Sequence, residues 1–152
     1  MLDPSQISTR LADRSDLPAV IALERRISTA AHWGEEQYEA IFEPPRRVLL
    51  VLEEAQYLQG FLIARAVGPE WEIENVVVDQ NSRRRGFGVR LIRAFLHLSR
   101  SEDLRTVFLE VRESNLAARA LYEKCGFRQT GRRTAYFTNP QEDAILYHLS
   151  VP

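Results

Sequence analysis

An arginine- and glycine-rich segment, residues 83–88, combines residue types that bind anions, and it reads RRRGFG. Glycine lets the backbone turn tightly and approach a ligand without a Cβ in the way. The first N–H groups of the helix predicted to follow have no partner inside that helix, and with the helix dipole they form a site suited to a pyrophosphate. The arginines can add charge-assisted contacts to phosphate.

The same segment has a simpler interpretation, which is a solvated run of arginines before an ordinary helix. A dinucleotide-binding Rossmann loop is a further alternative, but its G-x-G-x-x-G pattern fails because position 91 is Leu. Without its context, the segment does not decide between these interpretations.

A carboxylate stands in the middle of a predicted strand, residues 106–111. Strand alternation puts Glu110 on one face with Phe108 and Arg112, while Leu109 and Val111 point the other way. A charge in such a place is costly unless it is paired or faces an open cleft. Glu110 is therefore either half of an ion pair, with Arg112 or a neighbouring strand, or a catalytic carboxylate.

A tyrosine with a possible role in proton transfer lies on an apolar helical stripe. Tyr122 shares this stripe with Ala118, Leu121 and Cys125, so it is predicted to face the protein interior, where a tyrosine is usually a core residue. Cys125 is the only cysteine, which gives neither a disulfide nor metal-ligand spacing. A nucleophilic thiol needs a base and an accessible position, so we expect no cysteine-linked intermediate.

Apolar periodicity predicts the element order β-α-α-β-β-β-α-β-α-β-β, a mixed α/β sheet. The strands are expected at 7–11, 48–53, 58–67, 71–78, 106–111, 127–136 and 144–149. The helices are expected after a cap at Asp13 or Ser15 with Pro18 in the first turn, at 35–42, at 86–99, and around 118–125. Asn115 is expected as the N-cap at the start of the last helix, and Gly126 as its left-handed C-terminal cap. The central strand–helix–strand unit requires parallel pairing of the strands that it joins.

Length and composition fit one domain, residues 1–152, with 45% hydrophobic residues and a formal net charge of -1. A near-neutral charge argues against general nucleic-acid affinity. No apolar run approaches the roughly 18 residues of a membrane span, and the N-terminus lacks the pattern of a signal peptide. We therefore expect a cytoplasmic protein with no membrane or direct nucleic-acid partner.

Two motifs together resemble a known enzyme superfamily. The pattern R-x-x-G-x-G at 83–88, after the apolar run NVVVD at 75–79, resembles the coenzyme A pyrophosphate loop of GNAT acetyltransferases. Residues 115–127 are similar to that superfamily's second signature, N-x-x-A-x-x-x-Y-x-x-x-G-F. The resemblance implies a mostly antiparallel mixed sheet of about seven strands flanked by about four helices, with acetyl-coenzyme A as cosubstrate and no metal.

A closer resemblance within the superfamily is to the RimI-like bacterial enzymes that acetylate the N-terminal alanine of a small-subunit ribosomal protein. It is carried by LEVRESN at 109–115, RRTAYF at 132–137 and EDA at 142–144. HWGE at 32–35 stands where that family has P-W-S, and Phe137 replaces a family tyrosine. The resemblance implies a protein N-terminal α-amine as acceptor. A small-molecule amine, a lysine side chain, a non-catalytic coenzyme A-binding module and an RNA-associated adaptor are the alternatives.

The resemblance also implies roles for individual residues. Glu110 is implied as the catalytic base or a substrate ligand, and Tyr122 as the general acid at the thioester sulfur. If Glu110 is only a structural charge, Glu72, Glu74 and Tyr136 are the next candidates. The strand at 76–78 is implied to pair with the pantetheine amides through its main chain, which requires the adjacent sheet to splay. The implied coenzyme A contacts are Val76, Val77, Val78, Arg83, Arg84, Arg85, Gly86, Phe87, Gly88, Val89, Asn115 and Tyr122.

Overall fold

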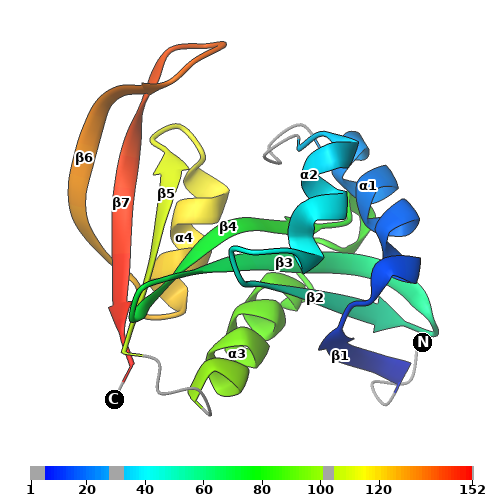
Figure 1. Ribbon diagram of the computed structural model, residues 1–152. Coiled ribbons are helices and arrows are strands. Elements are labelled where there is room, and N and C mark those ends of the chain that lie inside the picture. Colours follow the sequence, from blue (N-terminus) through cyan, green and yellow to red (C-terminus); the bar gives the residue numbers. More distant parts are fainter. Residues whose placement is uncertain (1–5, 28–32, 101–104, 152) are drawn as a thin grey trace.

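The computed structural model describes residues 6–27, 33–100 and 105–151, which form one seven-stranded sheet with helices on both faces (Figure 1). The sheet order is β1-β2-β3-β4-β5-β7-β6, and β4 and β5 are its one parallel pair. The strands are β1 (Ile7–Leu11), β2 (Arg47–Glu54), β3 (Tyr57–Val67), β4 (Glu70–Val78), β5 (Thr106–Arg112), β6 (Arg128–Phe137) and β7 (Glu142–Ser150). The predicted order and the predicted parallel pairing are confirmed.

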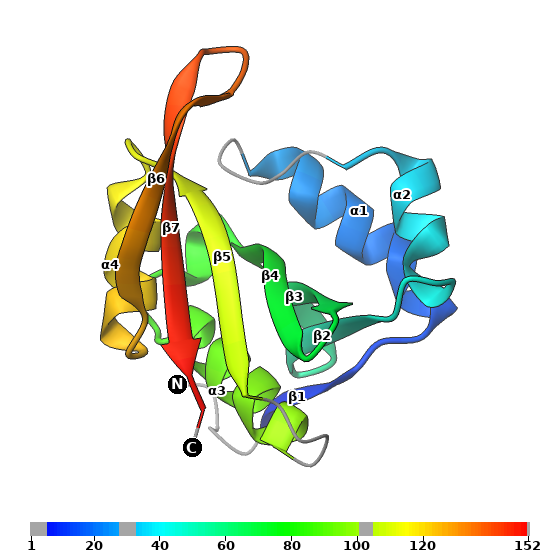
Figure 2. The ribbon, with the colours of Figure 1, turned by 60° about the vertical axis from the view of Figure 1, so that its left-hand side comes forward.

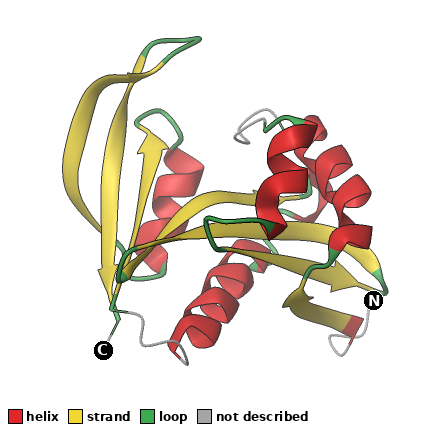
Figure 3. Cartoon of the chain, in the orientation of Figure 1, coloured by secondary structure: helices red, strands yellow, loops and turns green. Residues whose placement is uncertain are grey.

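In the described part of the chain, four α-helices and three short 3-10 helices lie between the strands; Figure 3 colours helices and strands separately. They are α1 (Leu17–Arg26), α2 (Glu35–Glu39), α3 (Phe87–Arg100) and α4 (Leu116–Lys124), with η2 (Arg14–Asp16), η3 (Ala40–Phe42) and η4 (Gln80–Ser82). Asp13 caps η2 by accepting a hydrogen bond from the Ser15 N–H, so α1 begins later, with Pro18 in its first turn. Gly126 has the left-handed backbone predicted for it, with φ at 98°.

Each face of the sheet carries its own hydrophobic core. On one face α3 buries Leu91, Ile92 and Phe95 in a cluster that also includes Tyr122 of α4. On the other face α1 and α2 pack together over β2, β3 and β4, and α1 buries residues such as Leu23 (Figure 2). Full burial of a large apolar side chain contributes about 1.5–3 kcal/mol, so these helices are fixed to the sheet mainly through their apolar stripes.

The contact between α3 and α4 depends on a glycine. A Cβ built on Gly88 would lie 2.9 Å from Cδ2 of Leu121, which is closer than real Cβ contacts come. From the sequence we expect a side chain at position 88 to enter the space between the loop and a pyrophosphate. The structure corrects this expectation, because the space beside the Gly88 Cα is occupied by Leu121.

We predict that Gly88→Val lowers the stability of the protein by about 1–3 kcal/mol, the usual cost of forcing extra methyl groups into a packed interface. The melting temperature without ligand measures this effect. Gly131→Ala is the control, because a Cβ there would have 4.0 Å of space to Leu146. An unchanged melting temperature for Gly88→Val would show that Leu121 can move aside freely.

Candidate active site

The sheet opens between β4 and β5. Their parallel register runs over three residue pairs, from Glu70 with Thr106 to Glu72 with Phe108, and no pairing follows it along the described strands. Beyond that point, β4 keeps its pairing with β3 and β5 keeps its pairing with β7 (Figure 2). The main chain of Val76–Val78 therefore has β3 on one side and an unpaired edge on the other. This is the splay that the resemblance requires.

A β-bulge marks the place where β4 changes course. Ile63 of β3 pairs with Asn75, and the next residue, Ala64, pairs with Ile73, so Glu74 is the extra residue of the bulge. A bulge bends its strand and increases the local twist. The bend lies beside the last β4–β5 pair, which explains why the two strands separate there.

The segment after β4 has the geometry of an anion site. Arg84 and Gly86 both adopt positive φ, 68° and 78°, so the backbone turns sharply before α3. The first helical hydrogen bond runs from the Arg90 N–H to the Gly86 carbonyl at 3.0 Å. The N–H groups of residues 87–89 precede this bond and have no acceptor inside the helix, so they are available to an anion.

The three arginines of the segment differ in their surroundings. Arg83 and Arg84 are exposed, and neither forms an ion pair within the described part of the chain. The guanidinium of Arg85 instead binds both carboxylate oxygens of Glu54 in β2, with N–O distances of 2.9 and 2.5 Å. The side chain of Arg85 is thus already engaged, whereas the other two are free to meet a phosphate.

Glu110 has the orientation predicted for it and an unexpected partner. Its side chain is 13% exposed, and its Oε1 accepts a hydrogen bond at 2.9 Å from Nε of Arg133 in β6. A further hydrogen bond to Glu110 raises the pKa of Tyr136, also in β6. The suggested pairing with Arg112 is wrong, because that guanidinium binds Glu142 and the carbonyls of the β6–β7 turn.

Two carboxylates of β4, those of Glu72 and Glu74, lie near Glu110 of β5. Arg65 of β3 binds Glu72 at 2.8 Å, and Arg47 of β2 binds Glu74 at 2.8 Å. Burial raises the pKa of Glu72, and its arginine partner opposes the shift. Both Glu74 and Glu110 raise that pKa further, which places the three carboxylates within electrostatic reach of one another. The residues that sequence reasoning placed second to Glu110 therefore belong to the same acidic face.

Tyr122 is buried on the α3–α4 face, where its ring contacts those of Phe127 and Tyr147. Burial raises its pKa, so the phenol stays protonated at neutral pH and can act as a donor. Within the described ranges, no group forms a hydrogen bond to its hydroxyl, which leaves the hydroxyl available to a ligand. Asn115 caps α4, as predicted, by accepting a hydrogen bond from the Ala118 N–H at 3.2 Å.

Cys125 follows α4 as its C-terminal cap and is only partly buried. Burial raises the pKa of its thiol, which disfavours the reactive thiolate at neutral pH. No described group of His, Cys, Asp and Glu residues has the arrangement to hold a metal ion.

A buried acid that sequence reasoning missed supports the segment before α2. Glu24 of α1 is fully buried, and its Oε1 accepts a hydrogen bond at 2.8 Å from the Trp33 N–H. The Trp33 ring in turn lies under Arg47, with 5.4 Å from Cζ to the ring centroid. His32 lies outside the described residues. The signal for Glu24 was its place on the apolar stripe, between Val20 and Ile27 at helical spacing.

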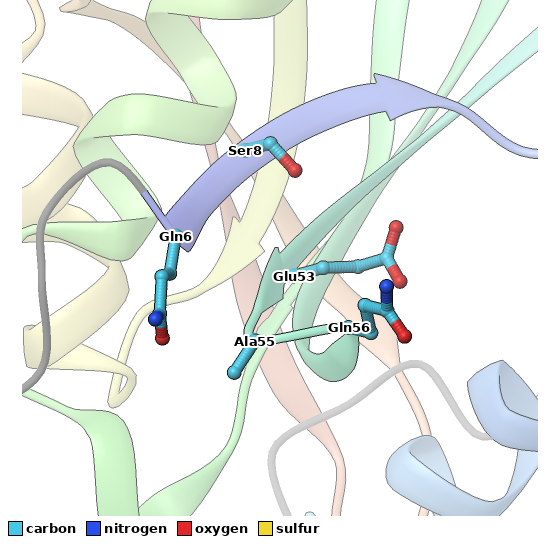
Figure 4. A pocket seen from close by; sticks show the side chains of 5 residues that line it. All are labelled: Gln6, Ser8, Glu53, Ala55 and Gln56. Atoms are coloured by element: carbon cyan, nitrogen blue, oxygen red, sulfur yellow. The ribbon is translucent and has the colours of Figure 1, made fainter.

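Two surface hollows lie away from this opening. One is formed by β1 and the β2–β3 turn and is lined by Gln6, Ser8, Glu53, Ala55 and Gln56 (Figure 4). The other lies between α1 and α2, where Leu17 and Ile21 form part of an apolar floor. None of the predicted site residues lines either hollow. Among the described helices, none is long and apolar enough to cross a membrane.

Comparison with known proteins identifies similar sequences and structures. The model of the acetyltransferase (GNAT) family matches residues 17–127. The ribosomal protein bS18-alanine N-acetyltransferase of Escherichia coli K12 is 33% identical over 141 residues, covering 91% of this chain and 94% of that protein. The enzyme of the same name from Salmonella typhimurium LT2 is 34% identical over 139 residues, covering 90% and 93%.

The likeness extends to three dimensions. The crystal structure of the ribosomal-protein-S18-alanine N-acetyltransferase from Escherichia coli superposes with a TM-score of 0.84 at 30% identity. The superposition covers 95% of this chain and 94% of that one.

The segment between β5 and α4 is held by a carboxylate of β7. Glu142 accepts a hydrogen bond at 2.6 Å from the Ser114 N–H. Hydrogen bonds from Ser114, and to a smaller extent the interaction with Arg112, hold the pKa of Glu142 below its ordinary value of 4.5. A lowered folded pKa contributes stability above the unfolded pKa, and this contribution is lost as the pH falls through the folded pKa. We expect Glu142→Gln to lower the melting temperature at pH 7, with a deficit that shrinks between about pH 5 and 3.

Thermal unfolding of both proteins across pH 3–7 measures this effect. Glu36→Gln is the control, because Glu36 is exposed and forms no ion pair among the described residues. A Glu142→Gln deficit that is constant with pH would show that ionisation of Glu142 is not coupled to folding.

Proposed function

Because this chain belongs to the acetyltransferase (GNAT) family, we propose that it transfers the acetyl group of acetyl-coenzyme A to a protein N-terminal α-amine. The acceptor we propose is the N-terminal alanine of ribosomal protein bS18, after the activity in the names of relatives that match over nine-tenths of the chain. A small-molecule amine or a lysine side chain is the alternative acceptor. With a ribosomal protein as its substrate, the enzyme belongs in the cytoplasm.

The observation that carries this proposal is the opening between β4 and β5, with a carboxylate cluster on one face and a protonated tyrosine on the other. Acetyl-coenzyme A would place its pyrophosphate on the N–H groups that begin α3. Its pantetheine amides would pair with the unpaired main-chain edge of Val76–Val78, as an added strand does. The proposed contacts are Val76, Val77, Val78, Arg83, Arg84, Arg85 through its main chain, Gly86, Phe87, Gly88, Val89, Asn115 and Tyr122.

The chemistry is a direct transfer. The neutral amine attacks the thioester carbonyl, the C–N bond forms and the C–S bond breaks. Glu110 accepts the proton that the amine loses, directly or through a water molecule, and Tyr122 donates a proton to the departing thiolate. An α-amine has a pKa of about 8, against about 10.4 for a lysine side chain, so an N-terminal acceptor is more readily deprotonated at neutral pH.

We predict that Glu110→Gln lowers kcat/KM at pH 7 by about 100-fold or more for a peptide that begins with alanine, because the proton acceptor is lost. Raising the pH above about 8 should recover part of the loss, since more of the amine is then already neutral. The measurement is kcat/KM against pH. Glu113→Gln is the matched control, because it breaks a similar ion pair, with Arg132 of β6, and leaves Glu110 intact.

The same assay tests the acceptor class with a second peptide that has a blocked N-terminus and an internal lysine. We expect this peptide to be a poor substrate for the wild type at every pH. A preference for the lysine peptide would overturn the N-terminal assignment and leave the acetyl transfer standing. An unchanged rate in Glu110→Gln would make Glu110 a structural charge and direct the search to Glu72, Glu74 and Tyr136.

We predict that Tyr122→Phe lowers kcat by about 100- to 10,000-fold while the affinity for acetyl-coenzyme A stays nearly unchanged, because packing is kept and the proton donor is lost. Steady-state release of free thiol gives kcat, and calorimetry gives the affinity. Tyr147→Phe is the control, since it removes a hydroxyl that is already engaged by Arg119 and Glu123 in the same cluster. An unaltered kcat in Tyr122→Phe would return Tyr122 to a packing role.

A further inference from the structure

The loop between β4 and α3 spans residues 79–86, and its second half, residues 83–86, is tied to the sheet by one ion pair. Both oxygens of Glu54, the last residue of β2, accept hydrogen bonds from the Arg85 guanidinium at 2.9 and 2.5 Å. Glu54 is only 6% exposed, and Cζ of Arg85 lies 4.7 Å from the centroid of the Phe87 ring at the start of α3. Hydrogen bonds from Arg85 hold the pKa of Glu54 below its ordinary value. The pair is therefore ionised, with the carboxylate largely shielded from water and the Arg85 side chain 39% exposed.

The ion pair between Arg85 and Glu54 restrains the backbone of the loop. Arg84 and Gly86, on either side of Arg85, both have positive φ, and a non-glycine residue rarely adopts this conformation without support from its surroundings. The first part of the loop has other tethers, from Ser82 to Gln59 at 2.5 Å and from Arg26 to Asp79 at 3.2 Å. Among the described residues, the contact with Glu54 is the one side-chain tether of residues 83–86.

The pair also has an electrostatic effect. A buried carboxylate without a partner would be costly, and near an anion site it would repel a phosphate. The guanidinium of Arg85 cancels this charge in a bidentate geometry that lysine cannot reproduce. Glu54 thereby neutralises the charge of Arg85 within the protein. Arg83 and Arg84 are exposed and form no ion pair among the described residues, so their charges are available to the ligand.

We propose that Arg85 is a positioning residue, which with Glu54 holds the loop in its anion-binding shape and whose guanidinium does not contact the pyrophosphate. The inference rests on the proposed binding of acetyl-coenzyme A and is independent of the acceptor. It assigns different roles to three neighbouring arginines that look equivalent in the sequence.

Calorimetric titration with acetyl-coenzyme A, without any acceptor, separates an anchor from a direct phosphate ligand. For an anchor, Glu54→Gln weakens binding by about tenfold, a change of about 1.4 kcal/mol. Arg85→Gln weakens it more, because Glu54 is left buried and unpaired. The double variant then binds about as well as Glu54→Gln alone, since neutral glutamine removes the repulsion. At saturating acetyl-coenzyme A, kcat should stay nearly unchanged in Glu54→Gln while KM for acetyl-coenzyme A rises.

A direct phosphate ligand gives the opposite pattern. Glu54→Gln would then release Arg85 toward the ligand, so affinity would be unchanged or higher, and the double variant would bind as poorly as Arg85→Gln. Either result overturns the anchor. Glu53→Gln is the matched control, because it breaks an ion pair of the neighbouring residue with Arg10 of β1, and its affinity should equal that of the wild type.

Titrations of Arg85→Lys and of the wild type separate failure of the anchor role from failure of the proposed function. If Glu54→Gln does not fold, Arg85→Lys keeps the charge and loses the bidentate geometry, and it should weaken binding by several-fold; unchanged binding would overturn the anchor. If the wild type itself fails to bind acetyl-coenzyme A, the proposed function fails. If the wild type binds acetyl-coenzyme A and Glu54→Gln binds it equally tightly, the anchor role of Arg85 is wrong and the proposed function still stands.

Discussion

The separation of β4 from β5 is the constraint on which the rest of the site depends. After three paired residues, β4 follows β3 and β5 follows β7, and the bulge at Glu74 supplies the bend that makes this possible. Main-chain N–H and C=O groups at an unpaired strand edge need water or a ligand as partners. The sheet therefore contains its own binding slot, and the loop that begins α3 lies at the end of the strand that forms one wall of it.

The charges on the acidic face follow a consistent rule. Glu72, Glu74 and Glu110 come from two strands, and each is matched by an arginine from a different strand. Unpaired carboxylates at this depth would be costly. Pairing offsets this cost and fixes the carboxylates in place, so a cationic amine that approaches the slot meets groups that can exchange one positive partner for another. The arginines that pair with these carboxylates, Arg47, Arg65 and Arg133, therefore belong to the site as well.

The glycine- and arginine-rich loop shows how one motif combines ligand binding with support. Gly86 provides the left-handed turn, whereas Gly88 provides room for Leu121 of α4. In the same way, Arg83 and Arg84 are exposed, whereas Arg85 is bound to Glu54. Two of these five residues, Gly88 and Arg85, thus make contacts within the protein itself. This division keeps the loop in shape before any ligand arrives, which lowers the ordering cost of binding.

The sequence by itself determined the element order, the parallel pair, the face of Glu110, the cap at Asn115 and the left-handed turn at Gly126. These depend on local periodicity and on neighbours within a few residues, which the chain displays directly. Only the tertiary structure decided that Arg133 rather than Arg112 pairs with Glu110, that Glu54 holds Arg85, that Leu121 fills the space beside Gly88, and that β4 leaves β5 after three pairs. Each of these is set by residues brought together from distant parts of the chain, through strand register and helix packing that periodicity does not encode.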